Sequence, residues 1–163
     1  MKESEILTYT VIGYIRTPFN EKAGIPIQSS ISKALGTVNL LPQYSEGLSD
    51  LGDFSHIYLI YHFHKANEYK LKVKPFLDDE ERGVFATRAP LRPNPIGISI
   101  VRLISIDKQE NKIELQGVDM LDQTPVLDIK PYIPRFDNFE ARTGWMSKVN
   151  SETVRKKISD NRF

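Results

Sequence analysis

Residues 98–118 read I-S-I-V-R-L-I-S-I-D-K-Q-E-N-K-I-E-L-Q-G-V and predict a β-hairpin. Residues 98–106 are dominated by β-branched and apolar side chains, which favour a long strand. The polar cluster at residues 107–112 is typical of a turn, and residues 113–118 alternate as a returning strand does. This part of the chain is therefore expected to form an antiparallel pair.

The strand pattern recurs along most of the chain. Further strands are predicted at residues 8–16, 37–41, 56–63, 71–76 and 126–130. The apolar run at 56–63 is typical of a central strand, whereas Pro75 confines 71–76 to a sheet edge. Neither strand–helix–strand alternation nor a G-x-G-x-x-G turn occurs, which disfavours a Rossmann fold. Seven or eight strands at roughly ten-residue spacing predict a mainly β fold, a single compact antiparallel β-barrel with short helices and long loops.

Three segments are expected to interrupt the strands. Residues 19–35 contain a glycine and a proline and show little periodicity, so they predict a long irregular loop of the kind that binds ligands or is disordered. Residues 44–51 predict a short helix. Ser151 is expected to cap a final short helix whose narrow apolar edge is Val154 and Ile158.

Composition limits the class of protein. The chain has 163 residues, enough for one domain, and its 22 Lys and Arg against 21 Asp and Glu give a net charge of +1. Bulk charge thus argues neither for nor against a nucleic-acid partner. The absence of cysteine excludes disulfides, thiolate metal sites and a cysteine nucleophile. The sequence has no apolar run of about 18 residues, and glutamates occupy the place of a signal peptide's apolar core, so a cytoplasmic protein is expected.

Residues 83–97, G-V-F-A-T-R-A-P-L-R-P-N-P-I-G, hold three prolines between two glycines. Each proline removes a backbone donor and extends the preceding residue, so this segment predicts a rigid loop. A rigid loop loses little entropy on binding, which would make Arg88, Arg92 and Asn94 a preformed polar clamp. With Arg88 at the end of a strand, the guanidinium groups favour an anionic or aromatic ligand. The alternative is a stiff connection whose arginines face water.

Two other clusters contain side chains of the types found in metal or acid–base sites. His62 and His64 share one face of the predicted strand, yet a third metal ligand is wanting nearby, so a histidine used for hydrogen bonding is favoured and no metal is expected. The carboxylates Asp119, Asp122 and Asp128 surround a proline turn. They fit either acid–base chemistry or the ordinary needs of a turn.

Taken together, these stretches resemble the TrmO-type, or TsaA-like, S-adenosylmethionine-dependent tRNA methyltransferases. The matching segments are residues 12–18 (I-G-Y-I-R-T-P), 26–28 (P-I-Q), 54–57 (F-S-H-I), 63–64 (F-H), 84–97 (V-F-A-T-R-A-P-L-R-P-N-P-I-G) and 119–132. They occur in the family's order, and the block around R-P-N-P-I-G with the later T-P-V-L-D-I-K-P-Y is specific.

The resemblance implies a β-barrel that binds S-adenosylmethionine at or near the interface of a homodimer. It implies methylation of N6 of N6-threonylcarbamoyladenosine (t6A) at position 37, in the anticodon loop of threonine tRNA. By motif, the cofactor contacts are Pro26, Ile27, Gln28, His64, Lys65, Arg88, Ile98, Asp122, Gln123, Thr124 and Pro125. Arg92 and Asn94 are expected to contact substrate or cofactor.

The chain departs from the family pattern at two positions. Gln123 stands where many members have the glycine of D-G-T-P, and Ile27 where some have the arginine of P-R-Q. If the glycine needs a positive φ, glutamine strains or reshapes the turn.

The resemblance also divides the chain. Residues 1–135 are expected to form the TrmO-type barrel domain, and residues 136–163 an extension with a short basic helix and no separate domain. Residues 147–163 hold five Lys and Arg against two acidic residues, a net charge of +3, which suits contacts with tRNA phosphates or simply a solvated helix.

Methyl transfer is expected to proceed by in-line displacement, with the protein supplying position. Asp128, Asp122 and Tyr132 are candidates for a base that removes the proton of the acceptor nitrogen. Two alternatives remain open at this point: a barrel that binds S-adenosylmethionine or nucleotides as a sensor or RNA-binding module, and a metal-dependent hydrolase built on His62 and His64.

Overall fold

The apolar run in the middle of the chain forms the central strand β3 (His56–His62). Its side chains alternate, so that Ile57, Leu59 and Tyr61 point into the core. On one side β3 pairs antiparallel with β6 (Ile96–Asp107), and on the other with β8 (Thr124–Pro131). The sequence pattern therefore places β3 between two long partners.

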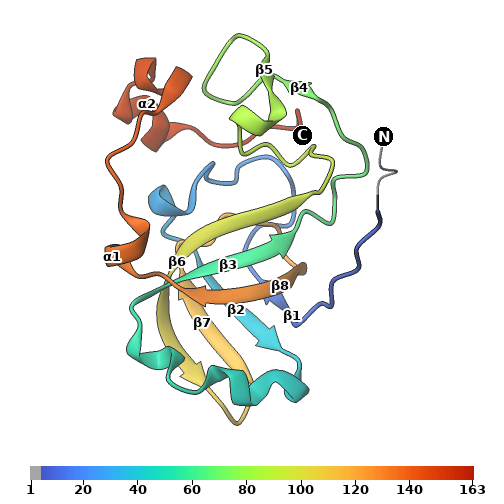
Figure 1. Ribbon diagram of the computed structural model, residues 1–163, viewed down its shortest axis with the longest axis vertical. Coiled ribbons are helices and arrows are strands. Elements are labelled where there is room, and N and C mark those ends of the chain that lie inside the picture. Colours follow the sequence, from blue (N-terminus) through green and yellow to red (C-terminus); the bar gives the residue numbers. More distant parts are fainter. Residues whose placement is uncertain (1–4) are drawn as a thin grey trace.

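Six strands close into a barrel in the order β1-β2-β7-β6-β3-β8, and every pair is antiparallel. The remaining barrel strands are β1 (Gly13–Arg16), β2 (Leu35–Leu40) and β7 (Lys112–Gln116). Figure 1, drawn from the computed structural model, shows the barrel in the lower half of the molecule. The structure describes residues 5–163. The predicted mainly β, non-Rossmann barrel and the hairpin of β6 and β7 are confirmed.

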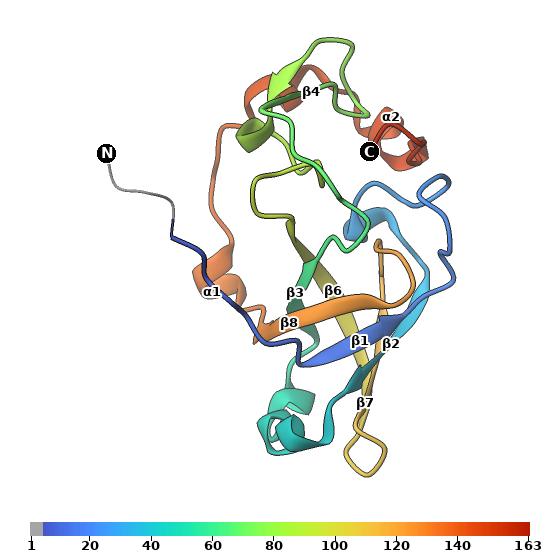
Figure 2. The ribbon, with the colours of Figure 1, turned by 90° about the vertical axis from the view of Figure 1, so that its right-hand side faces the viewer.

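The two ends of the barrel are covered differently. One end carries the 3-10 helices Pro42–Leu48 and Leu51–Asp53 and the turn between β6 and β7. The other end carries a small lobe and the C-terminal segment (Figure 2). These upper elements are the 3-10 turns Ser29–Ile31, Val84–Ala86 and Gly144–Lys148, the two-stranded sheet of β4 (Lys72–Val73) and β5 (Arg82–Gly83), and the helix α2 (Ser151–Lys156). The short helix α1 (Pro134–Asp137) lies at the side of the barrel.

Three strand predictions need correction. The strand expected at 8–16 is shorter, because pairing with β2 and β8 begins only at Gly13. The strand expected at 71–76 keeps two residues and pairs with β5 outside the barrel. Arg88 ends no strand, since it follows the turn Val84–Ala86 in an irregular segment.

The helix predictions need correction too. Residues 44–51 form two short 3-10 segments in place of one helix, with Asp50 between them at a positive φ of 64°. Asn150, and not Ser151, caps α2, because its side chain accepts a hydrogen bond from the backbone N–H of Glu152. Ile158 lies beyond the helix and forms an isolated β-bridge with Pro26.

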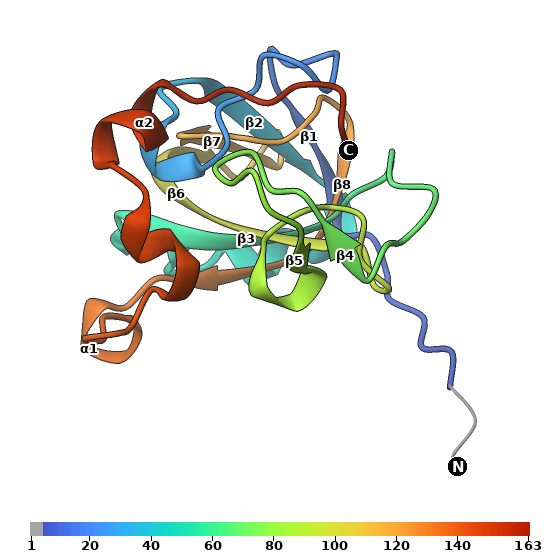
Figure 3. The same cartoon turned by 90° about the horizontal axis from the view of Figure 1, so that it is seen from above.

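The C-terminal segment runs from α2 back across the open end of the barrel (Figure 3). It thereby brings residues 158–163 beside the long loop that follows β1, as the bridge between Pro26 and Ile158 requires. None of the helices within residues 5–163 has the length and apolarity needed to cross a membrane. The sequence-based argument against a signal peptide rests on residues 1–7, and residues 1–4 of these lie outside the described part of the chain.

Candidate functional site

A pocket of about 280 Å³ opens at the end of the barrel where β3 finishes and β6 and β8 begin. Its volume is near the lower limit of small-molecule sites, roughly 300 Å³. The residues that line it come from the loop after β1, the end of β3, the loop between β4 and β5, residues 87–98, the turn before β8 and the C-terminal segment: Lys22, Ile25, Pro26, Ile27, Gln28, Tyr61, Phe63, His64, Lys65, Ala66, Phe76, Thr87, Arg88, Pro90, Arg92, Ile96, Gly97, Ile98, Asp119, Met120, Leu121, Thr124, Ser159, Asp160 and Phe163.

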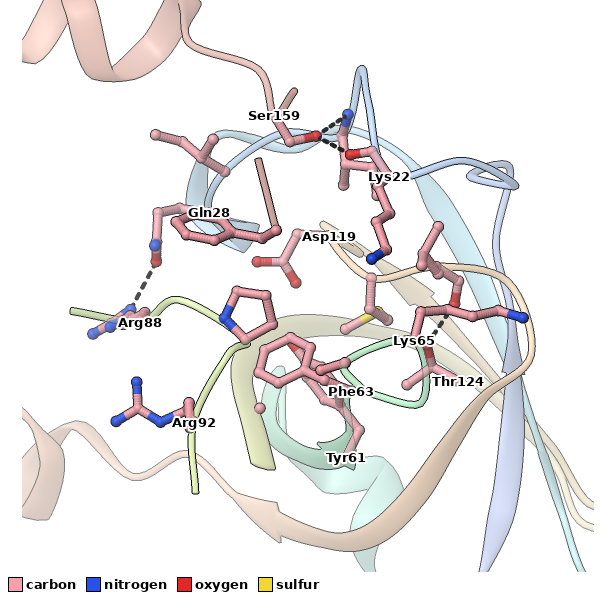
Figure 4. Close-up of a pocket in the computed structure, with 18 of the residues that line it drawn as sticks. Lys22, Gln28, Tyr61, Phe63, Lys65, Arg88, Arg92, Asp119, Thr124 and Ser159 are labelled. Atoms are coloured by element: carbon pink, nitrogen blue, oxygen red, sulfur yellow. Dashed lines mark hydrogen bonds between the residues drawn. The ribbon is translucent and has the colours of Figure 1, made fainter. Parts of the chain in front are cut away.

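The proline-rich loop forms one wall of the pocket and contacts the wall opposite. Arg88 Nη1 donates a hydrogen bond of 2.7 Å to Gln28 Oε1, which joins two segments 60 residues apart (Figure 4). Both side chains line the pocket, and Arg88 remains exposed. Its other guanidinium donors are thus available to an anionic ligand.

Arg92 stiffens the same loop from within. Its Nη1 lies 3.2, 2.9 and 3.3 Å from the carbonyl oxygens of Val84, Thr87 and Ala89. The guanidinium carbon also lies 6.0 Å from the centre of the exposed Phe85 ring. Arg92 therefore holds the turn in place with one end of its guanidinium while it lines the pocket.

His64 is held in one tautomer. The Thr124 hydroxyl donates its only proton to the carbonyl of Leu121 at 2.7 Å, so the contact of 3.3 Å between Thr124 Oγ1 and His64 Nδ1 needs a proton on Nδ1. Nε2 is then an acceptor. Burial, with help from the nearby ammonium group of Lys65, lowers the pKa of His64 below its usual value, so the ring is neutral at pH 7.

The turn before β8 is fixed by polar contacts outside the pocket lining. Asp122 accepts a hydrogen bond from the Thr17 backbone N–H at 2.9 Å and pairs with Arg16 at 3.2 Å. Gln123 has a φ of 62°, and with its amide oxygen toward Arg16 it accepts from Nη1 at 2.7 Å. The glutamine that replaces glycine thus adopts the conformation that glycine favours.

A chain of three hydroxyl and carboxyl groups reaches the pocket from the core. Ser99 donates to Asp119 Oδ1 at 2.6 Å, and the phenol of Tyr61 lies 3.1 Å from Ser99 Oγ. Because the Ser99 proton is engaged by Asp119, Tyr61 donates to Ser99. Burial raises the pKa of Asp119 to about 6, against the opposing effect of Ser99, the Ser29 backbone N–H and Arg88. Gly97 makes room for this chain, since a Cβ there would overlap the Tyr61 ring.

Ser159 ties the C-terminal segment to the loop after β1. Its hydroxyl donates to the Lys22 carbonyl at 2.6 Å and accepts from the Ile25 N–H at 2.9 Å. Two backbone hydrogen bonds, from Gly24 to Ser159 and from Ser159 to Ile25, flank this contact at 2.9 and 2.8 Å. The segment is therefore a firm wall of the pocket.

The last residues complete that wall with aromatic packing. Phe163 meets Phe76 edge to face at 4.9 Å between ring centres, and Arg162 lies 5.0 Å from the centre of the Phe76 ring. Arg162 also pairs with Asp160 at 2.7 Å and donates to the Pro75 carbonyl. The ion pair with Arg162 lowers the pKa of Asp160.

The residues predicted from the sequence fall into two groups. Nine of them line the pocket: Pro26, Ile27, Gln28, His64, Lys65, Arg88, Arg92, Ile98 and Thr124. Asn94, Asp122, Gln123, Pro125, Asp128 and Tyr132 are not among the lining residues. Asp128 pairs with Lys130 on the outer part of β8, and Tyr132 packs against His56 and Tyr58 at the far end of β3.

Sequence reasoning did not place Lys22, Tyr61 or the C-terminal residues in this site. It named Asp119 as one of three carboxylates around a proline turn, and Phe63 as part of a matching motif, but it gave neither of them a contact in the site. Tyr61 could have been found from the sequence, because its hydroxyl lies within the most apolar predicted strand and a buried tyrosine hydroxyl usually needs a hydrogen-bond partner. Asp119 could have been placed in the site too, because it follows the apolar pair of residues 117–118 at the end of a strand. Among residues 5–163, no group of three or more His, Cys, Asp or Glu side chains is placed to hold a metal ion.

Comparison with known proteins assigns the family. The profile of the tRNA-methyltransferase O N-terminal domain matches residues 14–138, which span the barrel and the pocket loops. The chain belongs to the TrmO family. A crystal structure of TrmO from Pseudomonas aeruginosa superposes with a TM-score of 0.72 at 42% identity, over 86% of this chain and 63% of that one.

Named relatives of this TrmO-family chain include archaeal and animal proteins. A Pyrococcus abyssi protein named "Probable S-adenosyl-L-methionine-binding protein" is 51% identical over 97% of this chain and 85% of its own length. The tRNA (adenine(37)-N6)-methyltransferase of Mus musculus is 42% identical over 78% of this chain. This chain spans 31% of the mouse protein and less than two thirds of the Pseudomonas TrmO structure.

Proposed function

We propose that this chain binds S-adenosylmethionine in the barrel-end pocket and transfers its methyl group to N6 of t6A at position 37 of threonine tRNA. The observation that carries the proposal is that three distant stretches of the TrmO pattern, at residues 26–28, 64–65 and 88–98, converge on one pocket. The names of the relatives, which refer to S-adenosyl-L-methionine binding and to methylation of adenine 37 in tRNA, support it.

The chemistry of the pocket suits this cofactor. S-adenosylmethionine carries a flat aromatic base, a ribose diol, a sulfonium cation and an amino acid end with both charges. The pocket offers Phe63 and Phe163 to the aromatic base, and the cations Lys22, Lys65 and Arg88 to the carboxylate. When bound, the cofactor supplies the reactive methyl group, and the protein supplies position.

We further propose that two copies of the chain associate through the outer face of β6. Ile96, Ile98, Ile100 and Ile104 form an apolar stripe there and are each between 39% and 51% exposed. Ile96 and Ile98 also line the pocket, so a second copy seated on this stripe would lie beside the cofactor. Arg102 lies between Ile100 and Ile104 on this face, so the continuous part of the stripe is Ile96, Ile98 and Ile100. Exposed apolar patches are typical of interaction surfaces.

The tRNA is proposed to contact the basic C-terminal segment, in the cytoplasm where tRNA is modified. Arg155 and Lys156 of α2 are exposed, and the segment that carries them forms one wall of the pocket. On this proposal residues 1–135 are the catalytic barrel and residues 136–163 are an extension that serves the same site.

The test of function uses purified protein, S-adenosylmethionine with a labelled methyl group, and threonine tRNA that carries t6A. Methylated t6A in digests analysed by mass spectrometry is the expected product, and the same tRNA without the threonylcarbamoyl group should stay unlabelled. Tight cofactor binding without transfer to either tRNA would contradict the proposal and favour a binding module.

Replacing Arg88 by alanine tests the cofactor assignment. The variant loses a cationic donor and its link to Gln28, so affinity for S-adenosylmethionine should fall about ten-fold by calorimetry, as loss of one charge-assisted hydrogen bond predicts. Arg135→Ala, at an exposed arginine of α1 that does not line the pocket, is the control. Equal affinity of the Arg88 variant and the parent would refute the assignment.

A further inference from the structure

Asp119 is the recessed carboxylate of the pocket, and no part of the proposed cofactor set uses it. It is half-buried at the end of the segment that follows β7, and Figure 4 shows its carboxylate projecting into the cavity between Lys22, Gln28 and Phe63. Oδ1 accepts the Ser99 hydroxyl at 2.6 Å. Ser99 is the one side chain within residues 5–163 that hydrogen-bonds Asp119, and the Ser29 backbone N–H also acts on the carboxylate. Each carboxylate oxygen has two lone pairs, so Oδ2 keeps an acceptor position for a ligand in the cavity.

We propose that Asp119 accepts the proton that the acceptor nitrogen loses during methyl transfer, and that Ser99 and Tyr61 position it. This inference rests on the proposed function. In the step, the lone pair of the acceptor nitrogen forms the bond to the methyl carbon. The pair of the broken carbon–sulfur bond stays on sulfur, and the N–H proton passes to Oδ2 of Asp119.

The hydrogen-bond chain gives Asp119 a defined direction. Tyr61 donates to Ser99 and Ser99 donates to Asp119, so each proton in the chain points toward the carboxylate. Tyr61 is 3% exposed, and burial raises its pKa, so it acts as a donor and not as the base. The carboxylate is thereby held in one orientation, while its second oxygen keeps a lone pair that can accept a proton.

The other polar groups of the pocket are less suited to this role. The charged or titratable side chains that share the cavity with Asp119 are Lys22, His64, Lys65, Arg88, Arg92 and Asp160. The four cations hold no acceptor. Asp160 is paired with Arg162, which lowers its pKa. His64 has an acceptor at Nε2, but burial lowers its pKa and so makes it a weaker base than an ordinary histidine. Asp119 has the opposite bias, with a pKa raised to about 6, as a general base working near neutrality needs.

The sequence-based candidates lie elsewhere. Asp122 already accepts from Thr17 and pairs with Arg16, and Asp128 pairs with Lys130. Asp128 lies four residues along β8 from Thr124, roughly 13 Å from that edge of the pocket at about 3.3 Å per residue. Asp119 lies in the cavity and, unlike Asp160, forms no ion pair within residues 5–163.

The test compares Asp119→Asn with the parent in single-turnover transfer at saturating cofactor. Asparagine keeps the size and an acceptor for Ser99, so affinity for S-adenosylmethionine should stay within about three-fold while the transfer rate falls by about 100-fold or more. Below about pH 6 the parent rate should fall ten-fold per pH unit, and the variant should lose this dependence. Asp107→Asn, in the turn at the opposite end of the barrel, is the matched control.

Two further variants separate positioning from structure. Ser99→Ala should move the midpoint of the pH–rate profile to higher pH, because the Ser99 hydroxyl lowers the pKa of Asp119. Tyr61→Phe should move it in the same direction by less. A role limited to packing would change the melting temperature of these variants and leave the midpoint in place.

Several results would overturn the inference. Equal transfer rates for the parent and Asp119→Asn would show that another group accepts the proton. If His64→Gln loses transfer while Asp119→Asn keeps it, that group is His64. A cofactor affinity lowered more than ten-fold, with the rate restored at saturation, would make Asp119 a cofactor ligand. If the parent itself transfers no methyl group to verified t6A-tRNA, the proposed function fails and the inference fails with it; an active parent confines the failure to Asp119.

Discussion

Gln123 occupies a backbone conformation that glycine adopts more easily. At a φ of 62° a side chain with a Cβ costs about 1–2 kcal/mol, whereas glycine there costs nothing in sterics. Part of this gain is offset because glycine makes the unfolded chain more flexible, by about 0.4–1 kcal/mol. Gln123→Gly should therefore raise the free energy of unfolding by about 0.5–1 kcal/mol in urea titrations.

A matched variant isolates the cause of that gain. Gln123→Ala also removes the amide that faces Arg16, yet it keeps a Cβ at the positive φ, so it should bring no stabilisation. If alanine and glycine stabilise equally, the amide and not the backbone is the source of strain.

The ionised carboxylate of Asp119 should lower the stability of the fold above neutral pH. Its pKa in the folded protein is about 6, above the ordinary value of 3.8, so the folded state binds the proton more tightly than the unfolded state. The stabilising contribution is complete below about pH 4 and is lost as the pH rises through about 6.

Asp119→Asn should accordingly be more stable than the parent at pH 8, by on the order of 1 kcal/mol. The difference should shrink toward zero at pH 4, and urea unfolding at several pH values measures it. A gap of the same size at pH 4 and pH 8 would mean that titration of Asp119 is not its origin. If Asp119→Asn is more stable than the parent but less active, the result also fits a carboxylate that is retained for catalysis at a cost in stability.

At the scale of elements, the sequence predicted most of the barrel strands but fewer of the elements that cover the pocket end of the barrel. Alternation along residues 98–118 and the apolar run at 56–63 predicted β6, β7 and β3, because one-sided burial leaves a period of two in the sequence. Residues 71–76 alternate in the same way, yet only two of them pair, since the barrel closes without them. Alternation indicates a strand-like segment but not its partner.

The pocket was predictable where one loop carried the signal and not where distant segments meet. The prolines of residues 83–97 indicated a stiff loop with Arg88 in it. Its contact with Gln28 joins residues 60 positions apart, and Ser159 bonds Ile25 across 134 positions. Local sequence rules describe neighbours along the chain, so they contain no information on these contacts.

The C-terminal segment should contribute to cofactor binding through Ser159. Ser159→Ala removes two hydrogen bonds, to Lys22 and from Ile25, each worth about 0.5–1.5 kcal/mol, and leaves the backbone bonds in place. Affinity for S-adenosylmethionine should fall about three- to ten-fold by calorimetry, and amide exchange at Ile25 should speed up. The exposed Ser147 of the same segment offers Ser147→Ala as a control without these effects. If amide exchange at Ile25 speeds up but the affinity for S-adenosylmethionine does not change, the C-terminal segment packs on the loop after β1 without contributing to cofactor binding.

At the scale of the whole molecule, the outer face of β6 links assembly to the pocket. Ile98 belongs both to the exposed stripe and to the pocket lining, so a copy of the chain bound to the stripe would change the cofactor's surroundings. Ile100, two residues along, lies on the stripe outside the lining. It therefore tests association without touching the cofactor directly.

Ile100→Lys should convert the proposed dimer into a monomer. An ammonium group buried against a second isoleucine stripe loses its hydration without a partner, which costs several kcal/mol and lowers the association constant by about 100-fold or more. Sedimentation at micromolar concentration measures the change. Leu35→Lys, at a leucine that is 64% exposed on β2, is the matched control and should leave the assembly intact. If the parent sediments as a monomer, or both variants retain the dimer, the stripe serves another purpose. If Ile100→Lys is monomeric and also binds S-adenosylmethionine more weakly, the second copy helps to form the site.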